Sequence, residues 1–370
     1  MTRTVFALAL LAAFSPVRAA DKLTGGDGML YLGGRPDRIF LIDEATEKVV
    51  DQIPCKTGLP MTLQLSEDRK RFYIESVSFE DFEIIDLPSR KSIDRFRVSE
   101  GNKRVRVFSY AVDPLNRFLI LETKTATKLM DRFETSSTEL LQYDLNQHKV
   151  TRTIPWPNGE AREFAGLRFS PDGKLLYLFG EDVLILDTKD FSLVDKWELS
   201  RPLENGFGRV SVNTFRDIGD ALGDPSNELN EEQGYVTSLF TVPDAVNNRR
   251  IMGIARANLT QKNVDFYALG PEAPVSFTLA PGRKWGYGLY SDIGKYEFWS
   301  FDLTNRRIDR RVEFPGRPRM SVKVSTNGKL LYIYEAGNTI DLYDAQNFKY
   351  LRTITLDGDM TTDLFVMRGK

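Results

Sequence analysis

The chain has 370 residues, with 50 Lys and Arg against 52 Asp and Glu and a formal charge of −2. Removal of Arg3 and Arg18 with a predicted leader peptide leaves 48 basic and 52 acidic residues, a formal charge of −4. Proteins that bind nucleic acids generally carry a net basic field or stripe, and this composition shows neither, so we exclude that class.

Residues 1–19 have the pattern of a secretory signal peptide. Arg3 gives a basic start, Val5 to Phe14 an apolar run, and Val17-Arg18-Ala19 a small-residue cleavage pattern before Ala20. The apolar run has ten residues, whereas a membrane-spanning helix needs roughly 20, and no later segment is long enough. We therefore expect a periplasmic or secreted protein without a membrane span, whose residues 20–370 form one domain.

A repeated unit dominates the remaining chain. It consists of a turn of the type Ser170-Pro171-Asp172-Gly173-Lys174, a strand with Tyr at its third position (Leu175-Leu176-Tyr177), and a second strand that ends in Asp187. An Asp or Asn at a strand end can start a turn by accepting hydrogen bonds from backbone N–H groups. The turn returns near residues 26–28, 66–70, 113–117, 280–284 and 325–329, the tyrosine as Tyr31, Tyr73, Tyr287 and Tyr332, and the strand-ending residue as Asp43, Asp86, Asp144, Asn258, Asp302 and Asp344.

Seven such units, spaced at roughly 40 to 50 residues and made of short strands and turns, predict a seven-bladed β-propeller of four-stranded antiparallel blades. The first blade begins at about Asp21 and lacks an inner strand, and the other blades begin near Leu59, Arg104, Arg162, Phe207, Ala273 and Arg319. One segment, Thr361 to Met367, is left over at the end. We expect it to complete blade 1 and so close the ring.

Three connections are longer than a tight hairpin. Glu122 to Ser137 and Pro243 to Arg250 join the second and third strands of blades 3 and 5, and Arg216 to Gln233 joins the first two strands of blade 5. The first two should project from one face and the third from the other. Long loops often carry function, so we expect the first face to contact a partner, although drift in a tolerant loop is an alternative. The candidate contact residues are Lys128, Met130, Phe133, Trp156, Asn247 and Arg249.

The residues needed for common catalytic centres are scarce. His148 is the only histidine and lies in a predicted outer turn, and Cys55 is the only cysteine and is expected to be a partly buried free thiol. A zinc site or a Cys-His or Ser-His-Asp arrangement is therefore hard to assemble, and haem attachment through Cys-x-x-Cys-His is excluded. We predict no catalytic residue and no cofactor in this chain apart from calcium.

Calcium binding remains possible because calcium is bound by carboxylate oxygens and needs neither histidine nor cysteine. The acidic run between Arg216 and Gln233 supplies the candidates Asp217, Asp220, Asp224 and Glu228, with Glu231 and Glu232 nearby. Their spacing matches no defined calcium loop, and a solvated acidic loop is the alternative.

The blade consensus, clearest in Phe169 to Tyr177 and Val183 to Thr188, resembles exported YVTN-type propeller repeats. The mature chain also resembles the β chain of quinohaemoprotein amine dehydrogenase, through Arg35-Pro36-Asp37-Arg38, Ser321 to Gly328 and Leu342-Tyr343-Asp344-Ala345. That resemblance implies a propeller without a redox centre, packed against a dihaem chain and a small quinone-bearing chain. No catalytic residue is carried over.

Two classes of function follow from the sequence. One is a non-catalytic scaffold or protein-interaction module, and the narrower form is the propeller subunit of a periplasmic amine dehydrogenase-like complex. The other is a stand-alone hydrolase of the lactonase type that uses carboxylate-bound calcium.

Overall fold

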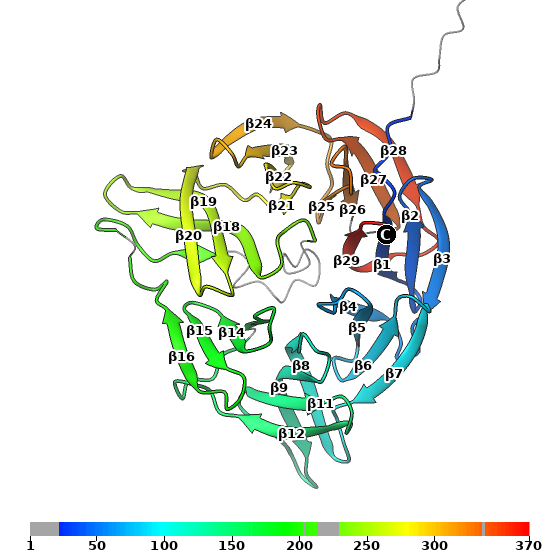
Figure 1. The fold of residues 1–370 in the computed structure, drawn as a ribbon, viewed down its shortest axis with the longest axis vertical. Helices are drawn as coiled ribbons and strands as arrows, with labels where there is room; N and C mark the ends of the chain where they lie inside the picture. Colours follow the sequence, from blue (N-terminus) through cyan, green and yellow to red (C-terminus); the bar gives the residue numbers. More distant parts are fainter. Residues whose placement is uncertain (1–21, 164, 203, 213–228, 335–336, 370) are drawn as a thin grey trace, which may run out of the picture.

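The computed structural model describes residues 22–163, 165–202, 204–212, 229–334 and 337–369. Every regular element in these residues is a β-strand, and the strands form seven antiparallel sheets arranged as blades around a ring (Figure 1). The predicted seven-bladed propeller is therefore confirmed. The described residues contain no helix that could cross a bilayer.

Each blade contains four strands in sequence order from the ring centre outward, except blade 1, whose inner strand comes from the end of the chain. Blade 1 is β29 (Met360–Met367), β1 (Met29–Gly34), β2 (Arg38–Asp43) and β3 (Lys48–Pro54). Blade 2 is β4 (Pro60–Leu65), β5 (Arg71–Ser76), β6 (Asp81–Asp86) and β7 (Lys91–Arg97). Blade 3 is β8 (Lys103–Val112), β9 (Phe118–Lys128), β11 (Glu139–Asp144) and β12 (Lys149–Ile154), with the additional short strand β10 (Phe133–Thr135).

The remaining four blades follow the same order. Blade 4 is β13 (Gly166–Phe169), β14 (Leu175–Phe179), β15 (Val183–Asp187) and β16 (Leu193–Trp197). Blade 5 is β17 (Ser211–Val212), β18 (Tyr235–Asp244), β19 (Arg249–Asn258) and β20 (Asn263–Pro271). Blade 6 is β21 (Thr278–Leu279), β22 (Trp285–Asp292), β23 (Lys295–Asp302) and β24 (Arg307–Glu313). Blade 7 is β25 (Ser321–Val324), β26 (Leu330–Tyr334), β27 (Thr339–Asp344) and β28 (Tyr350–Thr355).

The C-terminal strand closes the ring as predicted. β29 pairs with β1 in antiparallel register, from Met29 opposite Met367 to Leu32 opposite Leu364. Leu364 packs into the core between blades 7 and 1, and Phe365 packs into the core between blades 1 and 2, where its ring centroid is 4.9 Å from that of Phe72. Because successive side chains of a strand point to opposite sides, this one strand fills both interfaces of blade 1.

The repeated acids and tyrosines have the local roles that their positions indicate. The Asp43 carboxylate accepts a hydrogen bond of 2.7 Å from the Thr46 backbone N–H, so the strand-ending acid fixes the turn that comes next. Three of the repeat tyrosines join neighbouring blades through their hydroxyls. Their hydroxyls donate from Tyr73 to the Asn116 side chain (3.0 Å), from Tyr177 to the Leu259 carbonyl (2.6 Å) and from Tyr332 to the Glu44 carboxylate (2.8 Å).

In two of the expected long loops at least half of the residues belong to strands, so that expectation was wrong. Between 122 and 137, β9 continues to Lys128 and pairs with β8 on one side and with β10 on the other. Threonine at positions 123, 125 and 127 suits this extension, because β-branched residues favour the extended conformation. Between Pro243 and Arg250, β18 and β19 continue until only the four residues 245–248 form the turn.

Candidate functional site

The antiparallel order places the connections of each blade at two ends of the ring. We call the end that carries the second-to-third strand connections the hairpin face; it includes residues 35–37, 77–80, 129–138, 180–182, 245–248 and 293–294. We call the opposite end the turn face; it includes residues 66–70, 113–117, 170–174, 280–284 and 325–329. The two connections that were expected to share a face do so, and residues 229–233 belong to the opposite face.

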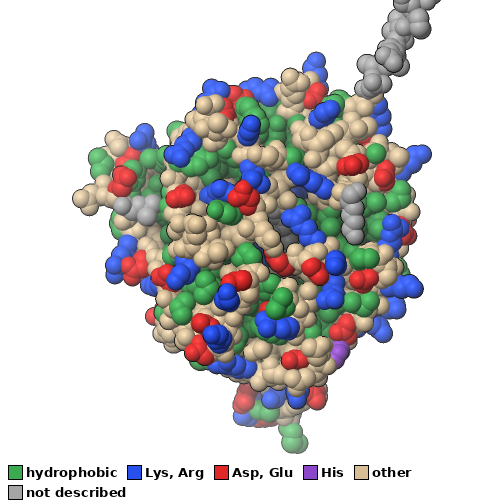
Figure 2. All heavy atoms as spheres, in the orientation of Figure 1, with side chains coloured by type: hydrophobic (Ala, Val, Ile, Leu, Met, Phe, Trp, Pro, Cys, Tyr) green, Lys and Arg blue, Asp and Glu red, His purple; other side chains and the backbone are tan. Residues whose placement is uncertain are grey.

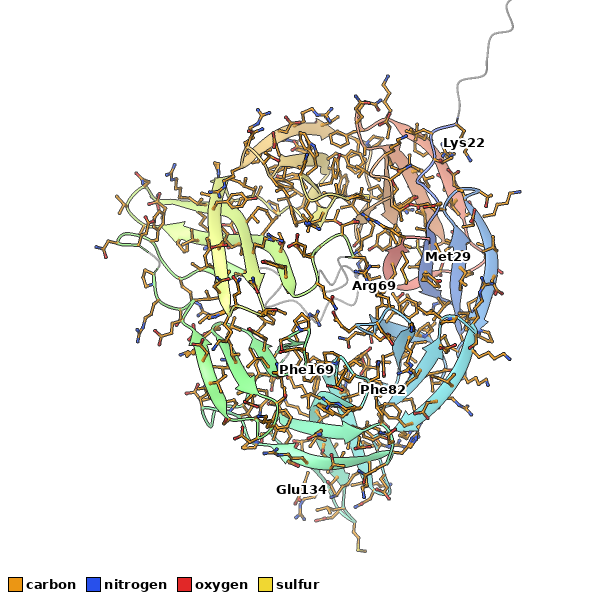
Figure 3. The ribbon with its side chains drawn as sticks, viewed as in Figure 1. Lys22, Met29, Arg69, Phe82, Glu134 and Phe169 are labelled. Carbon is orange, nitrogen blue, oxygen red and sulfur yellow. The ribbon has the colours of Figure 1, made fainter. Side chains whose placement is uncertain are left out.

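Three hairpins are longer than the others. The second strand has 11 residues in blade 3, ten in blade 5 and eight in blade 6, against five or six in blades 1, 2, 4 and 7. The hairpins of blades 3 and 5 reach beyond the outline of the ring, and Glu134 lies at its outer edge (Figures 1 and 3). The extra residues belong to paired strands and not to a loop, since β18 and β19 remain in register from Tyr235 opposite Asn258 to Asp244 opposite Arg249.

Each long hairpin ends in an exposed apolar side chain. Met130 and Ile293 are fully exposed, and Phe133 and Val246 keep 70% and 76% of their surface in contact with solvent. Single exposed apolar residues are common on protein surfaces, but apolar residues at the tips of three lengthened hairpins on one face are typical of an interaction site. The hairpin face is therefore the better candidate for contact with another molecule.

The predicted contact residues on the blade 3 hairpin are exposed. Lys128 ends β9 opposite Phe133, and Met130 lies in the turn between them. Trp156 differs, because its ring is half-buried against a core cluster and its indole N–H donates to the Thr138 carbonyl at 2.8 Å. These contacts fix the position of the connection between blades 3 and 4, so the described contacts of Trp156 are structural.

The predicted residues of blade 5 organise its turn. The Asp244 carboxylate accepts hydrogen bonds from the Asn247 side chain (2.9 Å) and from Arg249 Nε (2.8 Å). This arrangement presents Val246 at the tip. Val246 and Ile293 were not among the predicted contact residues, although an apolar residue in the middle of a polar turn is a usable sequence signal for both.

A buried carboxyl group lies near the hairpin face between blades 2 and 3. Glu75 is 3% exposed, and its nearest hydrogen-bond partner is the Thr62 hydroxyl at 3.5 Å. Burial raises the pKa of Glu75 to about 8, although the Thr62 hydroxyl and the positive charge of Arg106 act in the opposite direction. The Arg106 guanidinium lies over the Phe79 ring at 4.6 Å. Glu75 can therefore hold a proton at neutral pH.

The turn face contains a cavity of about 300 Å³ near the ring centre, lined by residues of blades 2 to 5. Residues 229–233 extend from blade 5 across to other blades: the Asn230 side chain donates to the Leu279 carbonyl at 2.9 Å, and Gln233 bonds to Glu67. Figure 2 shows a hollow near the centre of the ring that is bordered by both basic and acidic side chains, and Arg69 lies close to it (Figure 3).

The calcium candidates Asp217, Asp220, Asp224 and Glu228 lie outside the described residues, so calcium binding there stays a prediction. The two described acids of the same run are paired with arginines. Glu231 bonds to Arg256 at 3.0 Å, and Glu232 bonds to Arg256 at 3.1 Å and to Arg283 at 2.5 Å. In the described ranges, no group of three or more His, Cys, Asp or Glu side chains is arranged to hold a metal ion.

The single histidine and the single cysteine lie where the sequence placed them. His148 is in the turn between β11 and β12, half-exposed, with Nδ1 3.8 Å from the Asp94 carboxylate. Cys55 is a buried free cysteine, and burial raises the pKa of its thiol to about 12, so little thiolate forms at neutral pH. Both observations agree with structural roles.

Comparisons with known proteins identify the fold. No family model and no curated protein matches the chain. Among solved structures, the dihydro-haem d1 dehydrogenase NirN is 12% identical, with 95% of this chain and 78% of that chain covered and a TM-score of 0.51. A functionally unknown protein from Desulfotomaculum acetoxidans is 13% identical, with 93% and 100% covered and a TM-score of 0.52. At these identities the similarity extends to the fold alone.

Proposed function

We propose that this chain is an exported, non-catalytic scaffold whose hairpin face docks a partner protein. The observation that carries the proposal is the set of three lengthened hairpins, in blades 3, 5 and 6, which present Met130, Phe133, Val246 and Ile293 on one face. An apolar side chain that enters a pocket on a partner typically supplies a large share of the binding energy.

The polar groups around these tips fit the same role. Arg132 bonds to Glu134 at 2.7 Å, Arg249 to Asp244 at 2.8 Å, and Lys295 to Glu297 at 2.7 Å. These ion pairs neutralise charges close to the apolar tips, so docking need not bury an unpaired charge. An apolar centre with a polar rim is the usual anatomy of a protein interface.

The narrower form of the proposal is a subunit of a periplasmic amine dehydrogenase-like complex. The sequence resemblance supports it, and a protein with this fold, NirN, is a dihydro-haem d1 dehydrogenase. In such a complex a dihaem chain and a small quinone-bearing chain would supply the redox chemistry, and this chain would supply a docking surface. Native purification from the periplasm tests this form: isolation without haem absorbance and without a small bound chain would exclude it.

Substitution of the blade 3 tip tests the docking surface itself. The change Met130→Ser with Phe133→Ser removes two exposed apolar side chains, so we expect at least tenfold weaker retention of co-purifying partners. Leu115→Ser is the matched control, because Leu115 is 65% exposed in a turn of the same blade on the turn face. Equal retention by both variants would show that the hairpin face does not dock the partner.

A further inference from the structure

A groove of about 440 Å³ lies on the turn face between blades 6 and 7. Its walls include apolar, aromatic and cationic side chains from three parts of the chain: Leu23, Trp285, Tyr287, Arg310, Lys329 and Ala345. Leu23 comes from the segment before β1, and the others come from strands or turns of the two blades. The groove is on the opposite face from the long hairpins, so a ligand bound in it would not compete with a partner docked on the hairpin face.

Tyr287 differs from the other buried repeat tyrosines. Tyr73, Tyr177 and Tyr332 donate their hydroxyls to the next blade, but the Tyr287 hydroxyl makes no hydrogen bond to any described residue. Tyr287 as a whole residue is 8% exposed, and its ring packs edge-to-face against Phe348, with the ring centroids 6.2 Å apart. Its hydrogen-bonding group is therefore available to a ligand in the groove.

The sequence of blade 7 explains why Tyr287 has no side-chain acceptor of the kind that Glu44 gives Tyr332. Tyr332 bonds to Glu44, the residue after the strand-ending Asp43 of blade 1. The equivalent residue of blade 7 is Ala345, which comes after Asp344 and has only a methyl side chain. An alanine at this position cannot accept a side-chain hydrogen bond, and its small volume leaves space between the blades.

The groove carries a positive charge that can pair with an anion. The Arg310 guanidinium lies over the Phe348 ring at 4.9 Å, and its Nε donates to Asp309 at 3.3 Å, while its terminal nitrogens bond to none of the described residues. Lys329 is exposed and makes no ion pair within the described ranges. Among the described lining residues the only acid is Asp344, whose two oxygens already accept hydrogen bonds of 2.7 Å from the Gln346 backbone and the Asn347 side chain.

We propose that this groove binds a small organic anion, a carboxylate attached to an aromatic or branched apolar body. Arg310 and Lys329 would pair with the carboxylate, and the Tyr287 hydroxyl would donate to it. Trp285 and Leu23 offer apolar surface to the body of the ligand. Cationic and hydroxyl donors beside an apolar wall are the usual composition of a site for such a molecule.

Calorimetric titration of the full mature protein with phenylacetate tests the proposal, and phenylacetamide serves as the neutral isostere. We expect phenylacetate to bind with a dissociation constant in the range of about 0.1 to 5 mM, and phenylacetamide to bind at least tenfold more weakly. The double change Arg310→Gln with Lys329→Gln should abolish binding of phenylacetate. Absence of phenylacetate binding at about 20 mM, or equal affinity for the acid and the amide, would overturn the proposal.

A pair of tyrosine variants separates a ligand contact from a structural role. Tyr287→Phe should weaken phenylacetate binding about fivefold and leave the melting temperature unchanged, because this hydroxyl bonds to none of the described residues. Tyr177→Phe should lower the melting temperature and leave binding unchanged, since its hydroxyl bonds within the fold at 2.6 Å. If Tyr287→Phe instead destabilises the protein as Tyr177→Phe does and binds phenylacetate like the parent, the proposed site is wrong.

Discussion

Deletion of residues 360–370 should destabilise the whole ring, because it removes the inner strand of blade 1. The deletion takes out three buried apolar side chains, Met360, Leu364 and Phe365, of which the last two are completely inaccessible to solvent. Burial of a Leu, Phe or Met side chain contributes about 1.5 to 3 kcal/mol, so the three together contribute roughly 5 to 9 kcal/mol. The net stability of a typical domain is about 5 to 15 kcal/mol, and the deletion should therefore remove most of it.

Thermal unfolding followed by near-ultraviolet circular dichroism measures the effect. The matched control is deletion of residues 368–370 alone, which leaves β29 intact and should unfold like the full chain. If the longer deletion prevents folding, Phe365→Ala gives a graded version with an expected cost of about 3 to 5 kcal/mol. A melting temperature within about 2 °C of the full chain in the 360–370 deletion would refute closure of the ring by this strand.

Three further predictions concern single groups and metal removal. The pKa of Glu75 is about 8 in the folded chain against an ordinary 4.5, so the free energy of unfolding should fall as pH rises between these values. The Glu75→Gln variant should not show this fall. Urea unfolding of both proteins at about pH 5 and pH 9 measures the effect, and a difference in stability between them that is the same at both pH values would contradict this prediction. Cys55 should resist a thiol-directed chromogenic disulfide at about pH 8 in the native protein and react fully in guanidinium chloride; rapid native reaction would show that the thiol is accessible. Chelation should leave the melting temperature unchanged if the chain is a scaffold. Calcium bound to the protein before chelation, together with a lower melting temperature after chelation, would favour the hydrolase alternative.

The long connections of blades 3 and 5 were only partly predictable from the sequence. The sequence identified 122–137 and 243–250 as unusual and placed them on one face, and the structure confirms the face. Both segments were predicted to be loops, but pairing with neighbouring strands extends β9 into the first and β18 and β19 into the second. Whether a threonine-rich segment pairs depends on a partner strand at the right distance, which propensity alone does not specify.

The candidate contact residues were likewise only partly predictable from the sequence. Trp156 was predicted to be a contact residue from its place in a connection between blades, yet its indole N–H donates to the Thr138 carbonyl. Val246 and Ile293 were not selected, although their exposure at hairpin tips makes them part of the proposed docking surface. Exposure depends on which neighbouring blade covers a residue, and one chain segment does not contain that information.

The sequence by itself determined the number of blades, the closing strand and the turns, because these arise from local signals that recur along the chain. Asp43 and its counterparts start turns through bonds to residues two or three positions away, and Leu364 and Phe365 mark a strand that no local partner completes. Only the tertiary structure decided the chemistry between blades. The burial that raises the pKa of Glu75 and the missing acceptor of Tyr287 both depend on side chains from an adjacent blade, which come into contact only when the ring is formed.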